Sequence, residues 1–265
     1  MHEDGEATNN ISILQNEYIE KVWNDSLLKY SNILSGLFHK SVVLCESDSD
    51  CKLYKIIDEH IKKNKGVYSE ALFIHCGGKQ RLPVVIRALK ALDVNVRVIT
   101  DFVVLNDENT IKNITTAIGI SWDEVMPHYN IVANGVRGDG KEKINRNMLK
   151  AAFNEVLGRK ADELLSPKEI KELSNLLKTE SKLKSVKNSG KSALPAGQAS
   201  SSFDTLDTIF QNNGLFIVPV GELEGFVKSV GDHGPKSINE VLEKYPNFDD
   251  AVYEDVKKFV GALGI

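Results

Sequence analysis

Acidic side chains follow three separate short apolar runs that have the composition of buried β-strands. Glu46, Asp48 and Asp50 come after residues 41–45, Asp101 after residues 95–100, and Glu222 and Glu224 after residues 214–220. In an open α/β sheet the carboxyl ends of parallel strands converge on one crevice, which is where ligands bind. We therefore expect these carboxylates to meet at one site although they are far apart in the sequence.

A cluster of carboxylates is suited to holding a hard divalent cation, because Mg²⁺ takes oxygen ligands and offsets their mutual repulsion. Paired metal ions stabilise the attacking and leaving oxygens of a phosphodiester, so the chemistry would be phosphoryl transfer. The ordinary alternative is that an acid at a strand end caps the next helix. For Asp48, or its neighbour Ser49, capping is the better interpretation. For Glu46, Asp101 and Glu224 together, three independent strand ends favour the metal site.

Strand-like and helical runs alternate in the first part of the chain and so predict an α/β fold with a mainly parallel sheet flanked by helices. Apolar periodicity predicts helices at residues 51–62 and 81–92. The expected strands are residues 41–45, 71–75, 95–100 and 214–220, where Pro219 indicates a strand end or an edge position.

The remaining segments are mostly helical in pattern. The pattern of residues 11–38 predicts an entry helix that either packs on the domain or dimerises. The pattern of residues 106–179 predicts a charged helical insertion, with a helix cap at Ser166. Residues 181–202 are rich in Ser, Lys, Gly and Ala, so we expect a mobile linker or loop there. Helices are also expected at residues 203–212, 236–244 and 249–263.

Composition and charge favour a cytoplasmic protein. The 265 residues are 42% hydrophobic, enough for a full core, and no run approaches the length of a membrane span. Three cysteines at spacings that match no zinc site are expected to be small core residues.

Charge is unevenly distributed along the chain. Residues 141–191 hold 13 Lys and Arg against 7 Asp and Glu, a net charge of +6, which leaves −10 for the rest of the chain. This basic segment either contacts a DNA backbone or is a solvated surface.

Four motifs in order resemble the Toprim nuclease domain of the overcoming-lysogenization-defect (OLD) family. They are Val42-Val-Leu-Cys-Glu46-Ser-Asp-Ser-Asp50, His75-Cys-Gly77-Gly78-Lys79, Val98-Ile-Thr-Asp101-Phe-Val103, and Gly214-Leu-Phe-Ile-Val-Pro-Val-Gly-Glu222-Leu-Glu224. The resemblance extends over residues 41–226. It implies a Toprim domain at residues 41–265 with a basic helical insertion at about 106–202. Residues 1–40 would link it to an ATPase domain that is missing or separate.

The resemblance implies a Mg²⁺- or Mn²⁺-dependent DNA endonuclease or nickase that acts in anti-phage defence. Glu46 and Asp101 would be catalytic, and a lysine would balance charge on the cleaved phosphate. Lys79, beside the crevice, is the expected phosphate contact. Lys236 and Lys257 are the other candidates for the charge-balancing lysine. His233 is expected to be structural. The metal ligands or their supporting residues would be Glu46, Asp50, Asp101, Glu222 and Glu224.

One position departs from the family pattern, because Val103 stands where the second acid of an Asp-x-Asp motif is expected. Valine cannot coordinate a cation, so four alternatives stay open. The chain is a weakened nuclease, a one-metal enzyme, a variant rescued by Asp107, or a degenerate module that binds nucleic acid or a partner ATPase without cutting. Ser47, where many Toprim domains carry Gly, is a milder change. A Toprim enzyme of primase or topoisomerase type is a further, weaker alternative.

An ATPase motif is not expected within this sequence. Ser189-Gly-Lys191-Ser192 imitates the end of a Walker A motif, but Ser185 replaces its first Gly and no strand precedes it. The expected partners are therefore DNA and an ATPase, either as a domain of the same longer protein or as a separate chain. A homo-oligomer is also compatible with the entry helix.

Overall fold

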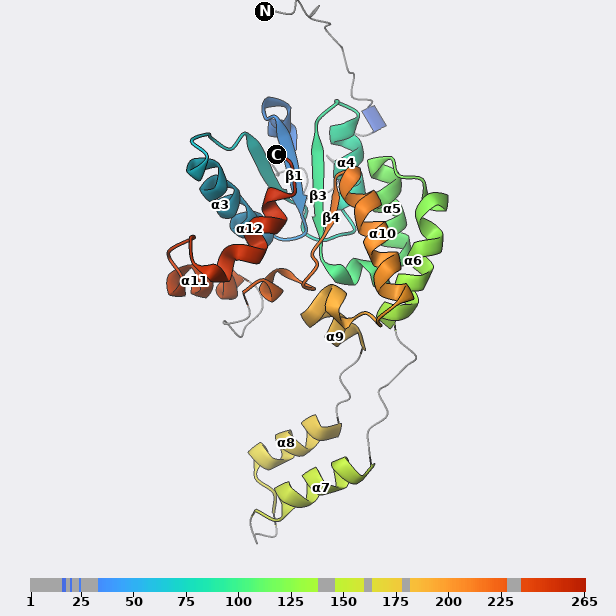
Figure 1. The fold of residues 1–265 in the computed structure, drawn as a ribbon, viewed down its shortest axis with the longest axis vertical. Helices are drawn as coiled ribbons and strands as arrows, with labels where there is room; N and C mark the ends of the chain where they lie inside the picture. Colours follow the sequence, from blue (N-terminus) through green and yellow to red (C-terminus); the bar gives the residue numbers. More distant parts are fainter. Residues whose placement is uncertain are drawn as a thin grey trace, which may run out of the picture.

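A parallel β-sheet forms the centre of the molecule (Figure 1). The computed structural model describes residues 33–137, 146–159, 164–177, 182–227 and 235–265, together with Asn16, Glu17, Glu20 and Asn24. In this part of the chain the sheet has four strands in the order β2-β1-β3-β4. They are β1 (Ser41–Cys45), β2 (Ala71–His75), β3 (Val96–Thr100) and β4 (Leu215–Ile217). The predicted α/β class is confirmed.

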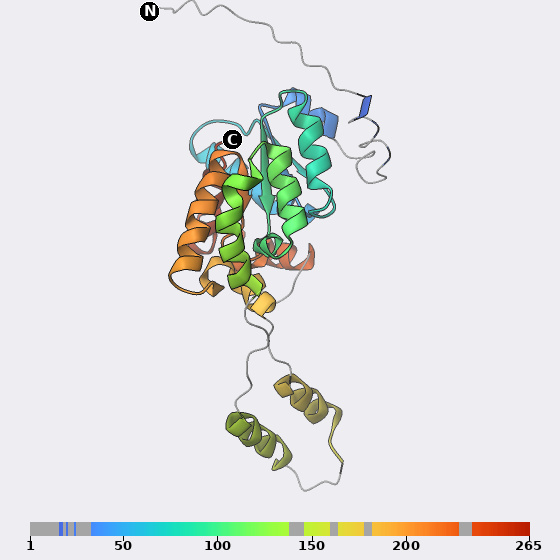
Figure 2. The ribbon, with the colours of Figure 1, turned by 90° about the vertical axis from the view of Figure 1, so that its right-hand side faces the viewer.

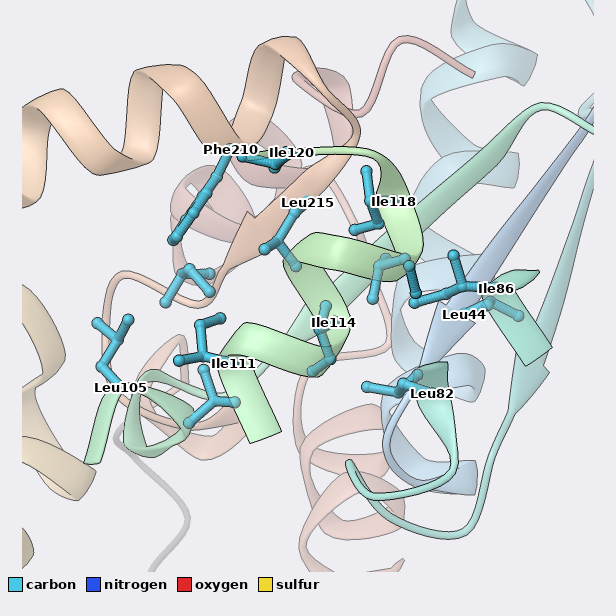
Figure 3. Packing of buried hydrophobic residues seen from close by; sticks show 14 of the residues in the cluster. Leu44, Leu82, Ile86, Leu105, Ile111, Ile114, Ile118, Ile120, Phe210 and Leu215 are labelled. Atoms are coloured by element: carbon cyan, nitrogen blue, oxygen red, sulfur yellow. The ribbon is translucent and has the colours of Figure 1, made fainter. Parts of the chain in front are cut away.

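Helices cover both faces of this sheet. Val42 and Leu44 of β1 belong to one hydrophobic cluster, and Val43 and Cys45 to the other, as the two-residue period of a buried strand requires. Figure 3 shows part of the first cluster, where Leu44 lies near Ile86. That face carries α4 (Leu82–Lys90), α5 (Glu108–Ile118), α6 (Trp122–Arg137) and α10 (Gln198–Asn212). The other face carries α3 (Asp48–Asn64), α11 (Pro235–Lys244) and α12 (Glu254–Gly261).

The last strand is shorter than the sequence suggests. β4 ends two residues before Pro219 and lies at the edge of the sheet, which agrees with the interpretation of that proline. Short 3₁₀ helices join the main elements. They are η1 (Ile33–Phe38), η2 (Phe102–Asn106), η3 (Gly190–Ala193), η4 (Leu223–Gly225) and η5 (Ala251–Tyr253).

The prediction of a mobile linker at residues 181–202 is wrong. This segment forms α9 (Lys182–Ser189), η3 and the first turn of α10. Val186 is buried in the core, and the Lys191 amide donates to the Pro219 carbonyl at 2.9 Å. A few anchoring contacts therefore order a stretch whose composition alone resembles a linker.

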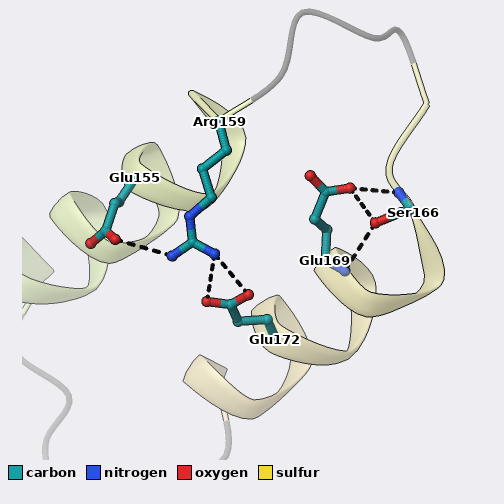
Figure 4. Close-up of polar contacts among 5 residues, drawn as sticks. All are labelled: Glu155, Arg159, Ser166, Glu169 and Glu172. Atoms are coloured by element: carbon teal, nitrogen blue, oxygen red, sulfur yellow. Dashed lines mark hydrogen bonds and ion pairs between the residues drawn. The ribbon is translucent and has the colours of Figure 1, made fainter.

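The insertion contains a helical pair, α7 (Arg146–Leu157) and α8 (Pro167–Leu177), which stands apart from the sheet in Figures 1 and 2. The two helices contact each other, and Arg159 joins them by pairing with Glu155 and Glu172 at 3.0 Å (Figure 4). Ser166 caps the start of α8, as predicted: the Ser166 amide donates to the Glu169 carboxylate at 2.8 Å, and the Glu169 amide donates to the Ser166 hydroxyl at 3.4 Å.

Two further expectations concern the cysteines and the ends of the chain. All three cysteines are buried and free, and burial raises the pKa of Cys76 to about 12, which confirms them as core thiols.

The predicted entry helix at residues 11–38 falls mostly outside the described residues, and its last part is the 3₁₀ helix η1. Within the described residues, none of the helices combines the length and the apolar character that a bilayer crossing requires.

Candidate metal centre

A cavity of about 550 Å³ lies at the carboxyl end of the sheet and brings together all the acids that the sequence analysis selected. Its acidic lining residues are Glu46, Asp48, Asp50, Asp101, Glu222 and Glu224. His75 and Lys187 also line it. The convergence follows from the parallel arrangement of the strands, since every loop that leaves a carboxyl end enters the same region.

Backbone hydrogen bonds tie the loops around the cavity to one another. The Glu46 carboxylate accepts from the Asp101 amide at 3.1 Å, and the Glu46 carbonyl accepts from the Gly78 amide at 2.9 Å. On the other side, the Phe102 amide donates to the Gly221 carbonyl at 2.8 Å. Glu46 therefore sits at the junction of the loops after β1, β2 and β3.

Helix capping explains only one of these acids. Ser47 is the N-cap of α3, and Asp50 completes a capping box by accepting from the Ser47 amide at 2.8 Å. The cap is thus Ser47, not Asp48 or Ser49 as predicted, and its extended φ of −124° shows why this position needs no Gly. Among the described hydrogen bonds, neither Asp101 nor Glu222 caps with its side chain, although each is the N-cap residue of a 3₁₀ helix.

Burial and mutual repulsion oppose ionisation of the central acids. Burial, then the charges of Glu46 and Asp50, raise the pKa of Asp101 to about 9. Burial raises the pKa of Glu46 to about 7, against the lowering effects of the Asp101 amide and the positive charge of Lys79. The pKa of Asp50 is also raised, mainly by burial. A cation in the cavity would relieve this repulsion.

Lys187, which was not among the residues selected from sequence, pairs with an acid of the cavity. Its Nζ lies 3.1 Å from Glu222 Oε1, and both residues line the cavity. The residue belongs to α9, in the segment expected to be a linker, so its position could not be inferred from composition. In the sequence it stands two residues before the Walker-like run that begins at Ser189, and nothing there marks it as a site residue.

Two glycines allow α9 to approach the turn after β4. Gly221 has φ +105°, and a Cβ there would lie 2.0 Å from the Lys187 carbonyl oxygen. Gly190 has φ +53°, and a Cβ there would lie 2.2 Å from the Pro219 carbonyl oxygen. A side chain at either position would separate the two backbones, so these glycines hold Lys187 over the acids.

The lysines proposed from sequence are less well placed. Lys79 is half-buried in the turn after β2 and influences the pKa of Glu46. Lys257 lies on α12 and pairs with Glu254 at 3.0 Å. Lys236 begins α11 with its side chain outside the described part of the structure, and His233 lies outside the described residues altogether.

The donor set fits a hard divalent cation, since carboxylate oxygens are the ligands that Mg²⁺ and Mn²⁺ prefer. Two buried hydroxyls beside the acids, Tyr54 and Thr100, have no hydrogen-bond partner among the described atoms. Burial, and then the neighbouring carboxyl groups of Asp50 and Asp101, raise the pKa of the Tyr54 hydroxyl. In the described residues no three acidic, His or Cys side chains yet converge tightly enough to hold an ion. Binding would therefore require the carboxylates to turn inward.

The structure gives no support to rescue of the Val103 position by Asp107. Asp107 caps α5, where its carboxylate accepts from the Thr110 amide at 3.1 Å and the Thr110 hydroxyl at 2.7 Å. These bonds lower the pKa of Asp107. Val103 is half-buried on η2, and the described lining of the cavity includes neither residue.

Comparison with known families identifies the part of the chain that carries most of this cavity. Residues 37–102 match the family described as overcoming lysogenization defect protein-like, TOPRIM domain. The match includes Glu46, Asp50, Lys79 and Asp101 and stops one residue before Val103. No curated protein and no solved structure matches the chain.

Proposed function

We propose that this chain, which contains a Toprim domain of the OLD-like family, is a divalent-metal-dependent nuclease that hydrolyses phosphodiester bonds of DNA. Toprim domains generally bind divalent metal ions and act on nucleic acids, so the family supports the broad class of function. The observation that carries the narrower proposal is the cavity itself. There the five acids expected to be metal ligands, which come from three distant loops, lie together with Lys187.

Each part of the cavity has a chemical role in this proposal. Glu46, Asp101 and Glu224 would hold Mg²⁺ or Mn²⁺ with the help of Asp50 and Glu222, and the ion would polarise the phosphate and supply an activated water. As an alternative to serving as a ligand, Glu46 would suit proton transfer, because its pKa of about 7 in the metal-free protein lies near neutral pH.

In this proposal, α9 and η3 would contact the DNA backbone through their lysines. Residues 182–191 hold four lysines and no acid, and Lys187 reaches the cavity. The helical pair α7 and α8 is less suited, because Arg159 is already paired with two glutamates. Within the basic segment, we therefore place the DNA contact on α9 and η3, with Lys79 as a second phosphate contact.

A degenerate binding module is the second candidate, and Val103 is the observation that favours it. Without the second acid, one metal position lacks a ligand and hydrolysis would be slow or absent. The lysines beside the cavity would still hold nucleic acid. In either case we propose a cytoplasmic role in anti-phage defence together with an ATPase, in the same longer protein or in a separate chain.

Cleavage of supercoiled plasmid DNA with Mg²⁺ or Mn²⁺ tests the proposal. The parent should nick or linearise the plasmid, Glu46→Ala should abolish this, and Val103→Asp should increase it. Asp255→Ala is the matched control, because it removes an exposed acid that pairs with Lys258 on α12, away from the cavity and from the proposed DNA contact. A silent parent with an active Val103→Asp variant would indicate a nuclease disabled at one metal position. Silence of both would favour the binding module or a required ATPase.

A further inference from the structure

An apolar surface lies at the amino end of the sheet, opposite the acidic cavity. Phe38 is 87% exposed and Tyr68 is 94% exposed, and each precedes a strand by three residues. We call this surface the amino-end patch; it consists of Leu34, Leu37, Phe38, Val67 and Tyr68. Exposed apolar side chains that gather on one side of a protein often mark interaction sites.

The members of the patch come from two adjacent stretches of backbone. Ser41 pairs with Ala71 in the sheet, and the Lys40 amide donates to the Glu70 carbonyl at 3.1 Å just ahead of that pair. Two residues further back, Phe38 and Tyr68 occupy equivalent positions. A cavity of about 470 Å³ beside them is lined by Val67, Tyr68 and the end of α3, including Lys63. The patch thus combines exposed apolar side chains with a cavity that could receive a side chain of a docked segment.

The chain itself supplies a segment suited to this surface. Residues 11–28 carry Ile11, Leu14, Tyr18 and Val22 at helical spacing, and they join η1 through only four residues. The described residues of this segment, Asn16, Glu17, Glu20 and Asn24, are helical and exposed. Their spacing in the sequence assigns them to the face of an ideal helix opposite the apolar positions.

Charge and tethering also favour docking within one chain. Residues 11–28 contain three acids and one lysine, a net −2, and Lys63 and Lys65 lie at the end of α3 next to Val67. A linker of four residues spans at most about 14 Å and raises the effective concentration to the millimolar range. We propose that residues 11–28 form a helix whose apolar face packs on the amino-end patch of the same chain. This inference does not depend on the proposed nuclease activity.

The fluorescence of Trp23 tests the inference, because Trp23 lies in the segment and Trp122 is the only other tryptophan. In a Trp122→Phe background, Trp23 should emit at short wavelength and resist acrylamide quenching. Adding Phe38→Ser and Tyr68→Ser should shift the emission to long wavelength and remove that protection. Both replaced side chains are almost fully exposed, so the core stays intact. Leu164→Ser with Leu165→Ser, two exposed residues before α8, is the matched control and should change nothing.

Three results would overturn the proposal. Trp23 emission typical of full exposure in the parent would show that the segment does not dock. Protection that survives Phe38→Ser and Tyr68→Ser would show that it docks elsewhere. Protection that disappears on dilution, together with a change from dimer to monomer mass in light scattering, would show that the patch receives the segment of a second copy.

Discussion

The two ends of one sheet present opposite chemistry. At the carboxyl end, six acidic side chains line a cavity, and burial raises the pKa values of Glu46 and Asp101. At the amino end, Phe38 and Tyr68 lie almost fully exposed. The first end contains charges that need a cation, and the second contains apolar surface that needs a covering element. From this comparison we expect the chemistry at the carboxyl end, and the docking of residues 11–28 of the same chain at the amino end.

Among the substitutions at the carboxyl end, Gly221→Ala should destabilise the fold most, because the new Cβ would lie 2.0 Å from the Lys187 carbonyl oxygen. We expect a loss of about 3 kcal/mol in the free energy of unfolding, from backbone clash and positive φ combined. Denaturant titration measures it. Gly197→Ala is the control, since Gly197 also has positive φ (+88°) but open space around its Cβ, and it should lose only about 1 kcal/mol. Equal losses in the two variants would show that the contact with α9 is unimportant.

The pH dependence of stability should also separate the two ends. Glu46 and Asp101 have raised pKa values in the folded state, so they bind more protons folded than unfolded. Their stabilising contribution is complete below about pH 4 and is lost as pH rises through about 7 and then 9. Metal-free protein should therefore lose several kcal/mol of stability between pH 5 and pH 9, at about 1.4 kcal/mol per pH unit for each group that is protonated only in the folded state. Added Mn²⁺ should restore it.

Thermal melts across this pH range measure the effect. Glu46→Gln should flatten the pH dependence, whereas Tyr68→Ser at the amino end should leave it unchanged. A profile that is flat in the parent, or that rises toward pH 9 without metal, would contradict the electrostatic account of the cavity.

Removal of Lys187 should reduce DNA cleavage without unfolding the protein. Lys187→Met takes away the cation that pairs with Glu222, and we expect a roughly 10- to 100-fold fall in cleavage rate. Lys191→Met is the control, because Lys191 pairs with Asp204 away from the cavity. Similar losses in both variants would indicate general attraction of DNA by α9 and η3 rather than a specific role for Lys187.

The smallest expected effect comes from the buried hydroxyl of Tyr54. Tyr54→Phe should weaken Mn²⁺ binding roughly tenfold, because that hydroxyl lies beside the acids and is available to orient them. Without metal the variant should be as stable as the parent or slightly more so, since a buried hydroxyl without a described partner is removed. A marked loss of metal-free stability would instead show that the hydroxyl has a structural partner.

Periodicity and motif spacing predicted most of the fold and of the acidic cluster. Strands such as β1 carry their own signature, because Ser41–Cys45 is buried on both faces. Acids that follow such strands must meet when the strands are parallel, so Glu46, Asp101 and Glu222 could be grouped without a structure. Ser166 likewise follows a local capping rule.

Long-range contacts set the limits of that prediction. Lys187 reaches the cavity because Gly190 and Gly221 allow two backbones, more than 25 residues apart in sequence, to touch. Nothing within residues 181–202 reveals this contact, and their composition favours a linker. The N-cap of α3 was predicted too late in the sequence, at Asp48 or Ser49. The helix itself begins at Asp48, three residues before its first strongly periodic position, so Ser47 is the cap.

Calorimetric titration of Mn²⁺ into the metal-free protein at pH 7, repeated in buffers of different ionisation enthalpy, tests the central claim most directly. The cavity should bind Mn²⁺ and release protons as Glu46 and Asp101, with pKa values of about 7 and 9, become ionised ligands. Glu46→Gln should bind more weakly and release fewer protons. If the parent binds no Mn²⁺, or if Glu46→Gln binds it with the same affinity and the same proton release, the cavity at the carboxyl end is not the metal centre.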